Sequence, residues 1–133
     1  MYLLDTNVIV RYLNQKSPLI IERLKTIAVK DIFICSIVKA ELFYGANKSN
    51  NPSKNLSNQK LFLDKFTSLD FDDKSAQQYG IIRAFLEKKG TPIGGNDLLI
   101  ASIAMANNLI LVTHNTREFA RIEGLLWEDW QEK

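Results

Sequence analysis

Short apolar runs alternate along the chain with longer segments in which apolar residues recur every three or four positions. The runs 2–4, 32–35 and 109–112 are wholly apolar, which predicts strands that are buried on both faces. Further short strands are expected at 68–71 and 125–127. Because strands alternate with helical segments, the pattern predicts an α/β fold with a parallel sheet covered on both faces.

The segments between these runs carry the start and stop signals of helices. One helix is expected directly after residue 5, and a second begins with Ser17 as its cap and Pro18 in its first turn. A third follows the strand at 32–35 and is predicted to end at Gly45.

The middle of the chain contains a polar stretch rich in Asn and Ser, residues 47–59, which we interpret as a loop or an irregular excursion. A helix with apolar residues between 56 and 66 should follow it. Another helix is predicted over 73–88, closed by Lys89 and Gly90. A last one should run to about residue 107, with Asn96 or Asp97 as its cap.

Composition narrows the possible functions. The 133 residues are 46% hydrophobic and 24% charged, which is typical of one globular domain, here residues 1–133. The net charge of +2 excludes a nucleic-acid binder dominated by its overall charge. We see no targeting or membrane-spanning segment and expect a soluble cytoplasmic protein.

The single cysteine and single histidine limit any metal chemistry. One Cys35 excludes an internal disulfide and a Cys-rich zinc site, and one His114 excludes paired-histidine metal motifs. The ligands of any bound metal must therefore be carboxylates.

Three acidic residues are candidate ligands. Asp5 directly follows the first strand, Glu41 lies early in the helix after the second, and Asp97 follows Gly94 and Gly95. Asp5 or Asp97 could equally be an ordinary helix cap or first-turn acid, and Glu41 could simply reach solvent.

Sites in open α/β sheets form at the carboxyl ends of the strands, where these acids could meet. Their mutual repulsion would be relieved by Mg²⁺ or Mn²⁺, which prefer oxygen ligands. Such a site activates water and screens phosphate charge during attack on a phosphodiester. Thr6, Thr113 and Asn115 could orient water or the ligand carboxylates.

The chain resembles the PIN-domain ribonucleases, and in particular the VapC toxins of bacterial type II toxin–antitoxin pairs. The matching segments occur in the family's order and cover nearly the whole chain; they are Leu4-Asp5-Thr6-Asn7, Ser36 to Gly45 including Ala40-Glu41-Leu42, Ile93 to Ala101 including Asn96-Asp97, Leu111 to Phe119, and Trp127-Glu128-Asp129-Trp130.

The resemblance implies a three-layer α/β/α sandwich around a short parallel sheet and metal-dependent cleavage of RNA. It implies metal-binding acids at Asp5, Glu41 and Asp97, with Asn115 at the family's fourth polar position and Asn96 as the other candidate for that corner. It also implies a homodimer and a cognate antitoxin that covers the acidic groove, often with a basic side chain at the metal site.

RNA contacts are expected beside the acids. Lys39, Arg117 and His114 are candidates, although each could be an ordinary surface or structural residue. The stretch 42–63 has no acid and carries Lys48, Lys54 and Lys60, which could bind RNA phosphates or only aid solubility.

Other functions compete with a toxin nuclease. A non-toxic RNA-processing nuclease would use the same site, whereas a non-catalytic RNA- or nucleotide-binding module should lack one of the three acids. A phosphatase with an aspartate nucleophile usually needs a second Asp two residues after the first, where this chain has Asn7.

Overall fold

The computed structural model describes residues 1–131, and its centre is a five-stranded sheet in which every neighbouring pair is parallel. The strand order is β3-β2-β1-β4-β5. The strands are β1 (Tyr2–Leu4), β2 (Ile32–Cys35), β3 (Thr67–Leu69), β4 (Ile110–Val112) and β5 (Trp127–Glu128).

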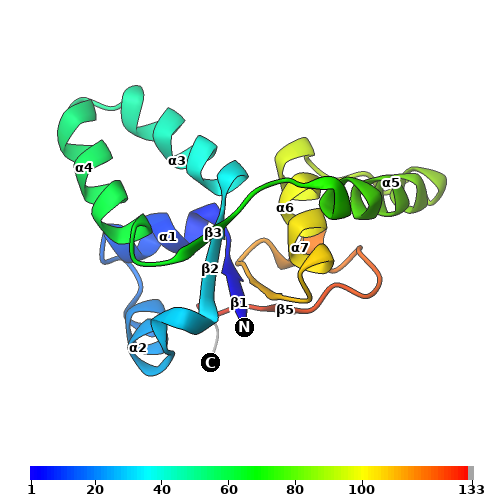
Figure 1. Ribbon diagram of the computed structural model, residues 1–133, viewed down its shortest axis with the longest axis horizontal. Helices are drawn as coiled ribbons and strands as arrows, with labels where there is room; N and C mark the ends of the chain where they lie inside the picture. Colours follow the sequence, from blue (N-terminus) through cyan, green and yellow to red (C-terminus); the bar gives the residue numbers. More distant parts are fainter. Residues whose placement is uncertain (132–133) are drawn as a thin grey trace.

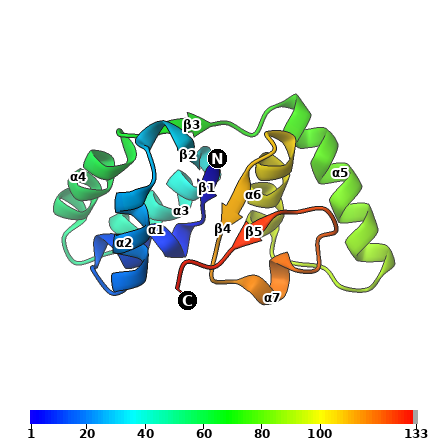
Figure 2. The same cartoon turned by 90° about the horizontal axis from the view of Figure 1, so that it is seen from below.

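Helices cover both faces of this sheet. Figures 1 and 2 show α1 to α4 on one side of the sheet and α5 to α7 on the other. The predicted α/β fold of three layers is thereby confirmed. The helices are α1 (Thr6–Leu13), α2 (Pro18–Thr26), α3 (Ser36–Asn47), α4 (Pro52–Leu63), α5 (Asp73–Lys88), α6 (Gly95–Ala106) and α7 (Thr116–Phe119), and a short 3₁₀ turn covers Val29–Asp31.

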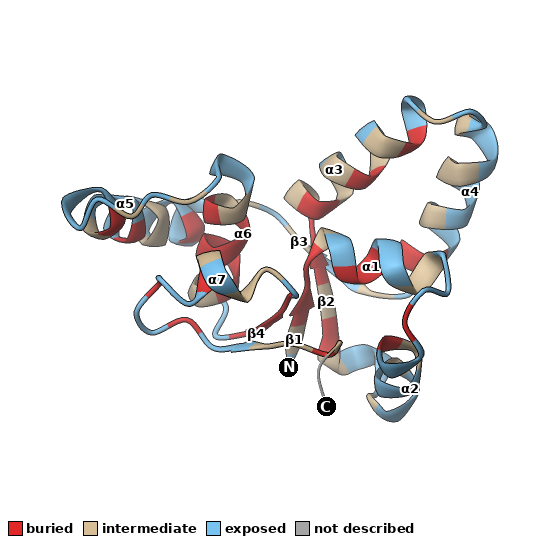
Figure 3. Cartoon of the chain, turned by 180° about the vertical axis from the view of Figure 1, so that it is seen from behind, coloured by how far each residue is buried: buried red, intermediate tan, exposed pale blue. Residues whose placement is uncertain are grey.

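The central strand β1 fixes the edge at which the candidate acids lie. Leu3 pairs with Leu111 of β4 and is fully buried, as is Leu4 after it (Figure 3). The pairing continues beyond the strand, because the Asp5 amide donates to the Val112 carbonyl at 2.9 Å. Asp5 is therefore held by the backbone at the carboxyl end of the sheet.

The interpretation of residues 47–59 as a loop is wrong for most of the stretch. Helix α4 begins at Pro52, and Asn51 caps it by accepting a hydrogen bond from the Lys54 amide at 3.3 Å. The long polar stretch hides this helix because α4 buries only Phe62 and Leu63, both in its last turn. Its stability therefore depends on the cap and on tertiary contacts at one end.

Two helix ends also differ from the sequence-based expectation. Helix α3 continues through Gly45 to Asn47, whose side-chain amide donates to the Phe43 carbonyl at 2.8 Å. Helix α6 has Gly94 at its cap position and no capping side chain, so the expected cap at Asn96 or Asp97 is wrong. Both side chains are engaged elsewhere, as described below.

Helix α7 does not follow from the sequence pattern, because four residues are too few to show a helical period. Its last residue, Phe119, is fully buried and anchors the segment after β4 to the core. Among residues 1–131, none of the helices is both long and apolar enough to cross a membrane.

We predict that Phe119→Ala lowers the free energy of unfolding by about 3–5 kcal/mol, because it removes a fully buried ring and leaves a cavity. Urea denaturation followed by circular dichroism measures this loss. Arg117→Ala, at an exposed position of the same helix, is the control and should change stability by about 0.5 kcal/mol or less. Equal losses in the two variants would contradict the anchoring role of Phe119.

Candidate active site

Asp5 lies at the junction of β1 and α1, with only 5% of its surface exposed. One carboxylate oxygen accepts from the Thr6 amide at 2.8 Å, and the other accepts from the Thr113 hydroxyl at 2.8 Å. Burial raises the pKa of Asp5, these two hydrogen bonds lower it, and the charge of Glu41 raises it again. Asp5 is thus a helix cap and also a member of an acidic cluster.

Glu41 lies on α3 and is oriented by two polar neighbours from other helices. The Thr6 hydroxyl donates to Glu41 Oε1 at 2.5 Å, and the Asn96 amide donates to Oε2 at 3.3 Å. Thr6 therefore connects two acids, because its backbone binds Asp5 and its side chain binds Glu41. Asn96 contacts an acid of the cluster instead of capping α6.

Asn115 joins the third acid to a fourth. Its side-chain amide donates to Asp97 Oδ2 at 3.0 Å and to Glu118 Oε2 at 2.9 Å. Its backbone amide donates to the Thr113 hydroxyl oxygen at 3.0 Å. Both amide hydrogens are used, so Asn115 holds two carboxyl groups side by side.

Sequence reasoning missed Glu118 as a member of this site. It lies three residues after Asn115, a spacing that places two side chains on one face of a helix. That signal could be used only if α7 had been predicted, and four residues do not reveal a helix. The structure therefore supplies a carboxyl group next to the neutral Asn115.

Contacts within the cluster shift the pKa values of Asp97 and Glu118 in opposite directions. Burial, a hydrogen bond with Glu118 and the charges of the neighbouring acids raise the pKa of Asp97 to about 7. The same contact with Asp97 and the amide of Asn115 lower the pKa of Glu118. Near neutral pH, Asp97 is therefore partly protonated, and it shares a hydrogen bond with Glu118.

The donor set suits a hard divalent cation, because it consists of carboxylate, hydroxyl and amide oxygens. Burial is the largest cause of the raised pKa of Asp97, and the negative charges of Asp5, Glu118 and Glu41 add to it. Within residues 1–131, however, no group of three acids already converges as a complete ligand set. Binding of a cation would require release of the proton and small rotations of these side chains.

The three residues expected to contact RNA lie on α3, on α7 and in the segment between β4 and α7. Lys39 is half-buried on α3, and Arg117 is exposed on α7. His114 Nδ1 lies 2.9 Å from Asp129 Oδ2. Among the described residues, none of the three forms an ion pair with Asp5, Glu41 or Asp97.

The raised pKa of Asp97 predicts how the stability of the metal-free protein depends on pH. The unfolded chain releases this proton near pH 3.8 and the folded chain near 7, so folding becomes less favourable as pH rises between these values. Asp97→Asn should therefore raise the melting temperature relative to wild type by a few degrees more at pH 8 than at pH 5. Thermal denaturation in EDTA tests this, and a difference that is the same at both pH values would contradict it.

Comparison with known proteins agrees with this geometry. Residues 2–125 match the family model described as PIN domain. Ribonuclease VapC2 of Rickettsia felis is 45% identical over 130 residues, which cover 97% of each chain. The tRNA(fMet)-specific endonuclease VapC of Shigella flexneri is 40% identical over 129 residues, again covering 97% of each chain.

A solved structure shows the same fold. The crystal structure of VapBC2 from Rickettsia felis bound to a DNA fragment from the promoter contains a chain that superposes with a TM-score of 0.91. The identity is 44%, and the match covers 97% of this chain and 98% of that one. Sequence, fold and the acids at the sheet edge lead to one conclusion: the chain belongs to the PIN-domain family, as a VapC-type ribonuclease, the toxin of a toxin–antitoxin pair.

Proposed function

We propose that this ribonuclease is an endonuclease that depends on Mg²⁺ or Mn²⁺ and hydrolyses structured RNA at the cluster of Asp5, Glu41, Asp97 and Glu118. The observation that carries the proposal is the arrangement of the acids: Thr6 joins Asp5 to Glu41, and Asn115 joins Asp97 to Glu118. The charges of Asp5, Glu118 and Glu41 also help burial to raise the pKa of Asp97. Cleavage of such RNA inhibits translation, which accounts for toxicity. We place this activity in the cytoplasm, within one catalytic domain.

Asp5 and Asp97 are the residues that would hold the cation, with Glu41 as a further ligand. When bound, the metal ion lowers the pKa of water and screens the charge of the phosphodiester. Thr113 and the Thr6 amide keep the Asp5 carboxylate in place, and each carboxylate oxygen retains a further acceptor site. Asn96 and the Thr6 hydroxyl do the same for Glu41.

Asn115 and Glu118 act through Asp97. The amide of Asn115 keeps the two carboxyl groups adjacent. The proton that Asp97 binds in the metal-free protein would leave to solvent when a cation binds, because the pKa of Glu118 is lowered. Asp97 is then ionised when it is needed as a ligand. Asn115 is in this view a positioning residue, and its neutrality avoids a fifth negative charge in the cluster.

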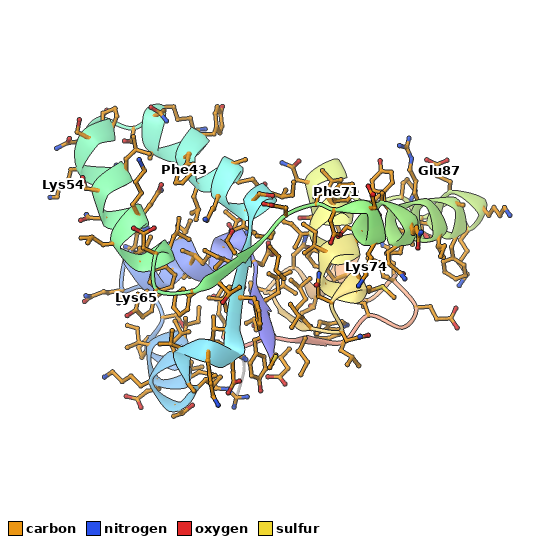
Figure 4. The ribbon with its side chains drawn as sticks, in the orientation of Figure 1. Phe43, Lys54, Lys65, Phe71, Lys74 and Glu87 are labelled. Atoms are coloured by element: carbon orange, nitrogen blue, oxygen red, sulfur yellow. The ribbon has the colours of Figure 1, made fainter. Side chains whose placement is uncertain are left out.

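We infer that the substrate is a transfer RNA and that the initiator tRNA is the first to test. The support is the relative from Shigella flexneri, a tRNA(fMet)-specific endonuclease that is 40% identical over nearly the full length of both chains. Lys39, Arg117 and His114 would contact this RNA near the acids. Figure 4 shows Lys54 on the outer side of α4 and Lys65 just beyond its end, a solvent-facing position that suits solubility as well as binding.

We also infer that a cognate antitoxin binds this protein and that the active form is a homodimer. The support for the antitoxin is the VapBC2 complex from Rickettsia felis, whose toxin chain shares this fold. A basic side chain from the antitoxin would be attracted to the four acids by the same Coulomb force that attracts a cation.

The test of the proposed function is cleavage of purified initiator tRNA with Mg²⁺ or Mn²⁺. We expect wild-type protein to cut it, EDTA to abolish cutting, and Asp5→Asn to slow it by about 10²-fold or more, because a charged ligand is lost. Asp64→Asn, at an exposed position after α4, is the matched control and should cut like wild type. RNA left intact by metal-loaded wild type would overturn the proposal, and cutting that survives EDTA would point to a contaminant.

Metal binding should also stabilise the folded protein independently of activity. Mg²⁺ or Mn²⁺ at about 100 times its dissociation constant should add about 2.7 kcal/mol of stability and so raise the melting temperature. Asp5→Asn should lose most of this rise, whereas Asp64→Asn should keep it. An equal rise in both variants would place the cation elsewhere in the protein.

A further inference from the structure

A hollow of about 530 Å³ adjoins the acids on the side of α1. It lies between α1 with the turn that follows it and the segment that leads from β4 to α7. Its polar wall includes Asn7, Arg11, Asn14, Lys16, His114 and Asn115. Asn115 belongs to both sites, because its amide also holds Asp97 and Glu118.

The charge of this hollow is opposite to that of the acids next to it. Arg11 and Lys16 are exposed, and neither forms an ion pair with an acid among residues 1–131. None of the described residues that line the hollow is acidic. The hollow is therefore positively charged, whereas the neighbouring acids, which Asn115 also contacts, are negatively charged.

The backbone at the end of α1 brings the two cations together. Gln15 adopts a left-handed conformation with φ of 52°, which is uncommon for a residue other than glycine. The Gln15 amide donates to the Tyr12 carbonyl at 3.0 Å, and the Lys16 amide donates to the Arg11 carbonyl at 2.9 Å. This is a Schellman closure, which fixes Lys16 beside Arg11.

His114 on the opposite wall is also held in place. Its Nδ1 lies 2.9 Å from Asp129, whose side chain is only 10% exposed. An ionised carboxylate only accepts hydrogen bonds, so Nδ1 is the donor and the ring is oriented by it. The Nε2 atom is then left for a ligand, on a side chain that is 51% exposed.

We propose that this hollow binds the sugar–phosphate backbone of the RNA next to the bond that is cleaved. The inference rests on the proposed RNA cleavage and names where the substrate lies. Arg11 and Lys16 neutralise phosphates, and the amides of Asn7 and Asn14 donate hydrogen bonds to phosphate or ribose oxygens. No Phe, Tyr or Trp is among the described residues that line the hollow, so the His114 ring is the one aromatic surface there on which a base could stack.

The experiment measures binding apart from cleavage. In an Asp5→Asn background, the affinity for initiator tRNA is measured by fluorescence anisotropy at several salt concentrations. Adding Arg11→Ala and Lys16→Ala should weaken binding about 10-fold or more. It should also reduce the slope of log affinity against log salt by about 1.4, because two phosphate contacts are lost.

A second pair removes the same charge elsewhere. Lys30, in the 3₁₀ turn before β2, and Lys88, in the last turn of α5, are exposed and do not line the hollow. Lys30→Ala with Lys88→Ala should weaken binding less than about twofold. Arg11→Lys with Lys16→Arg keeps both charges and should restore most of the affinity, and melting temperatures show whether every variant is folded.

Kinetics with Asp5 intact give a second readout. Arg11→Ala with Lys16→Ala should raise KM about 10-fold and leave kcat within about threefold, because contacts to neighbouring phosphates, and not to the reacting one, bind substrate and transition state alike. A lower kcat at unchanged KM would overturn the proposal. So would equal effects of the two alanine pairs, or a loss of antitoxin binding while RNA affinity matches that of the control pair.

Failure of the proposed function and failure of this inference give different results. If wild-type protein neither binds nor cuts RNA, the proposed function fails and this inference fails with it. If wild-type protein binds and cuts RNA and the two alanine pairs behave alike, only the assignment of the hollow is wrong.

Discussion

Repulsion between carboxyl groups that the fold forces together is the constraint on which the rest of this structure depends. A parallel sheet brings the ends of its strands to one edge, and here that edge gathers Asp5, Glu41, Asp97 and Glu118. Such a cluster is unfavourable in a metal-free protein, and a proton on Asp97 relieves part of the repulsion. The polar residues around the cluster hold the acids in place despite their mutual repulsion.

The supporting contacts come from elements that are distant in the chain. Thr6 of α1 contacts Glu41 of α3, Thr113 after β4 contacts Asp5 after β1, and Asn96 of α6 contacts Glu41 across the site. Each contact depends on the strand order, which places β1 between β2 and β4. The core beneath is fully buried at Leu3, Leu4 and Phe119, so the site lies on a rigid base.

The acids and the neighbouring cationic side chains have different proposed roles, which are metal binding and phosphate binding. The acidic side suits a divalent cation and repels free phosphate, whereas Arg11 and Lys16 attract it. With a cation bound, both sides would be favourable to an RNA strand, and without it only the cationic hollow would be. A net charge of +2 conceals this separation, because the two signs cancel in the sum.

The sequence by itself determined much of the fold and most of the candidate site. The wholly apolar runs marked the strands because buried parallel strands leave no polar face, and Asp5, Glu41 and Asp97 followed from their places near strand ends and helix starts. It predicted a helix with apolar residues between 56 and 66, which overlaps the second half of α4. It could not reveal the polar first half of α4, or α7, which is too short to show a helical period.

Only the three-dimensional structure showed three further features. These are the contribution of Glu118, the contact of Asn96 with Glu41, and the backbone closure that places Lys16 next to Arg11. The first two depend on contacts between residues that are remote in the chain, and the third depends on an unusual turn of the backbone. The spacing of hydrophobic residues along the sequence encodes neither the contacts nor the turn.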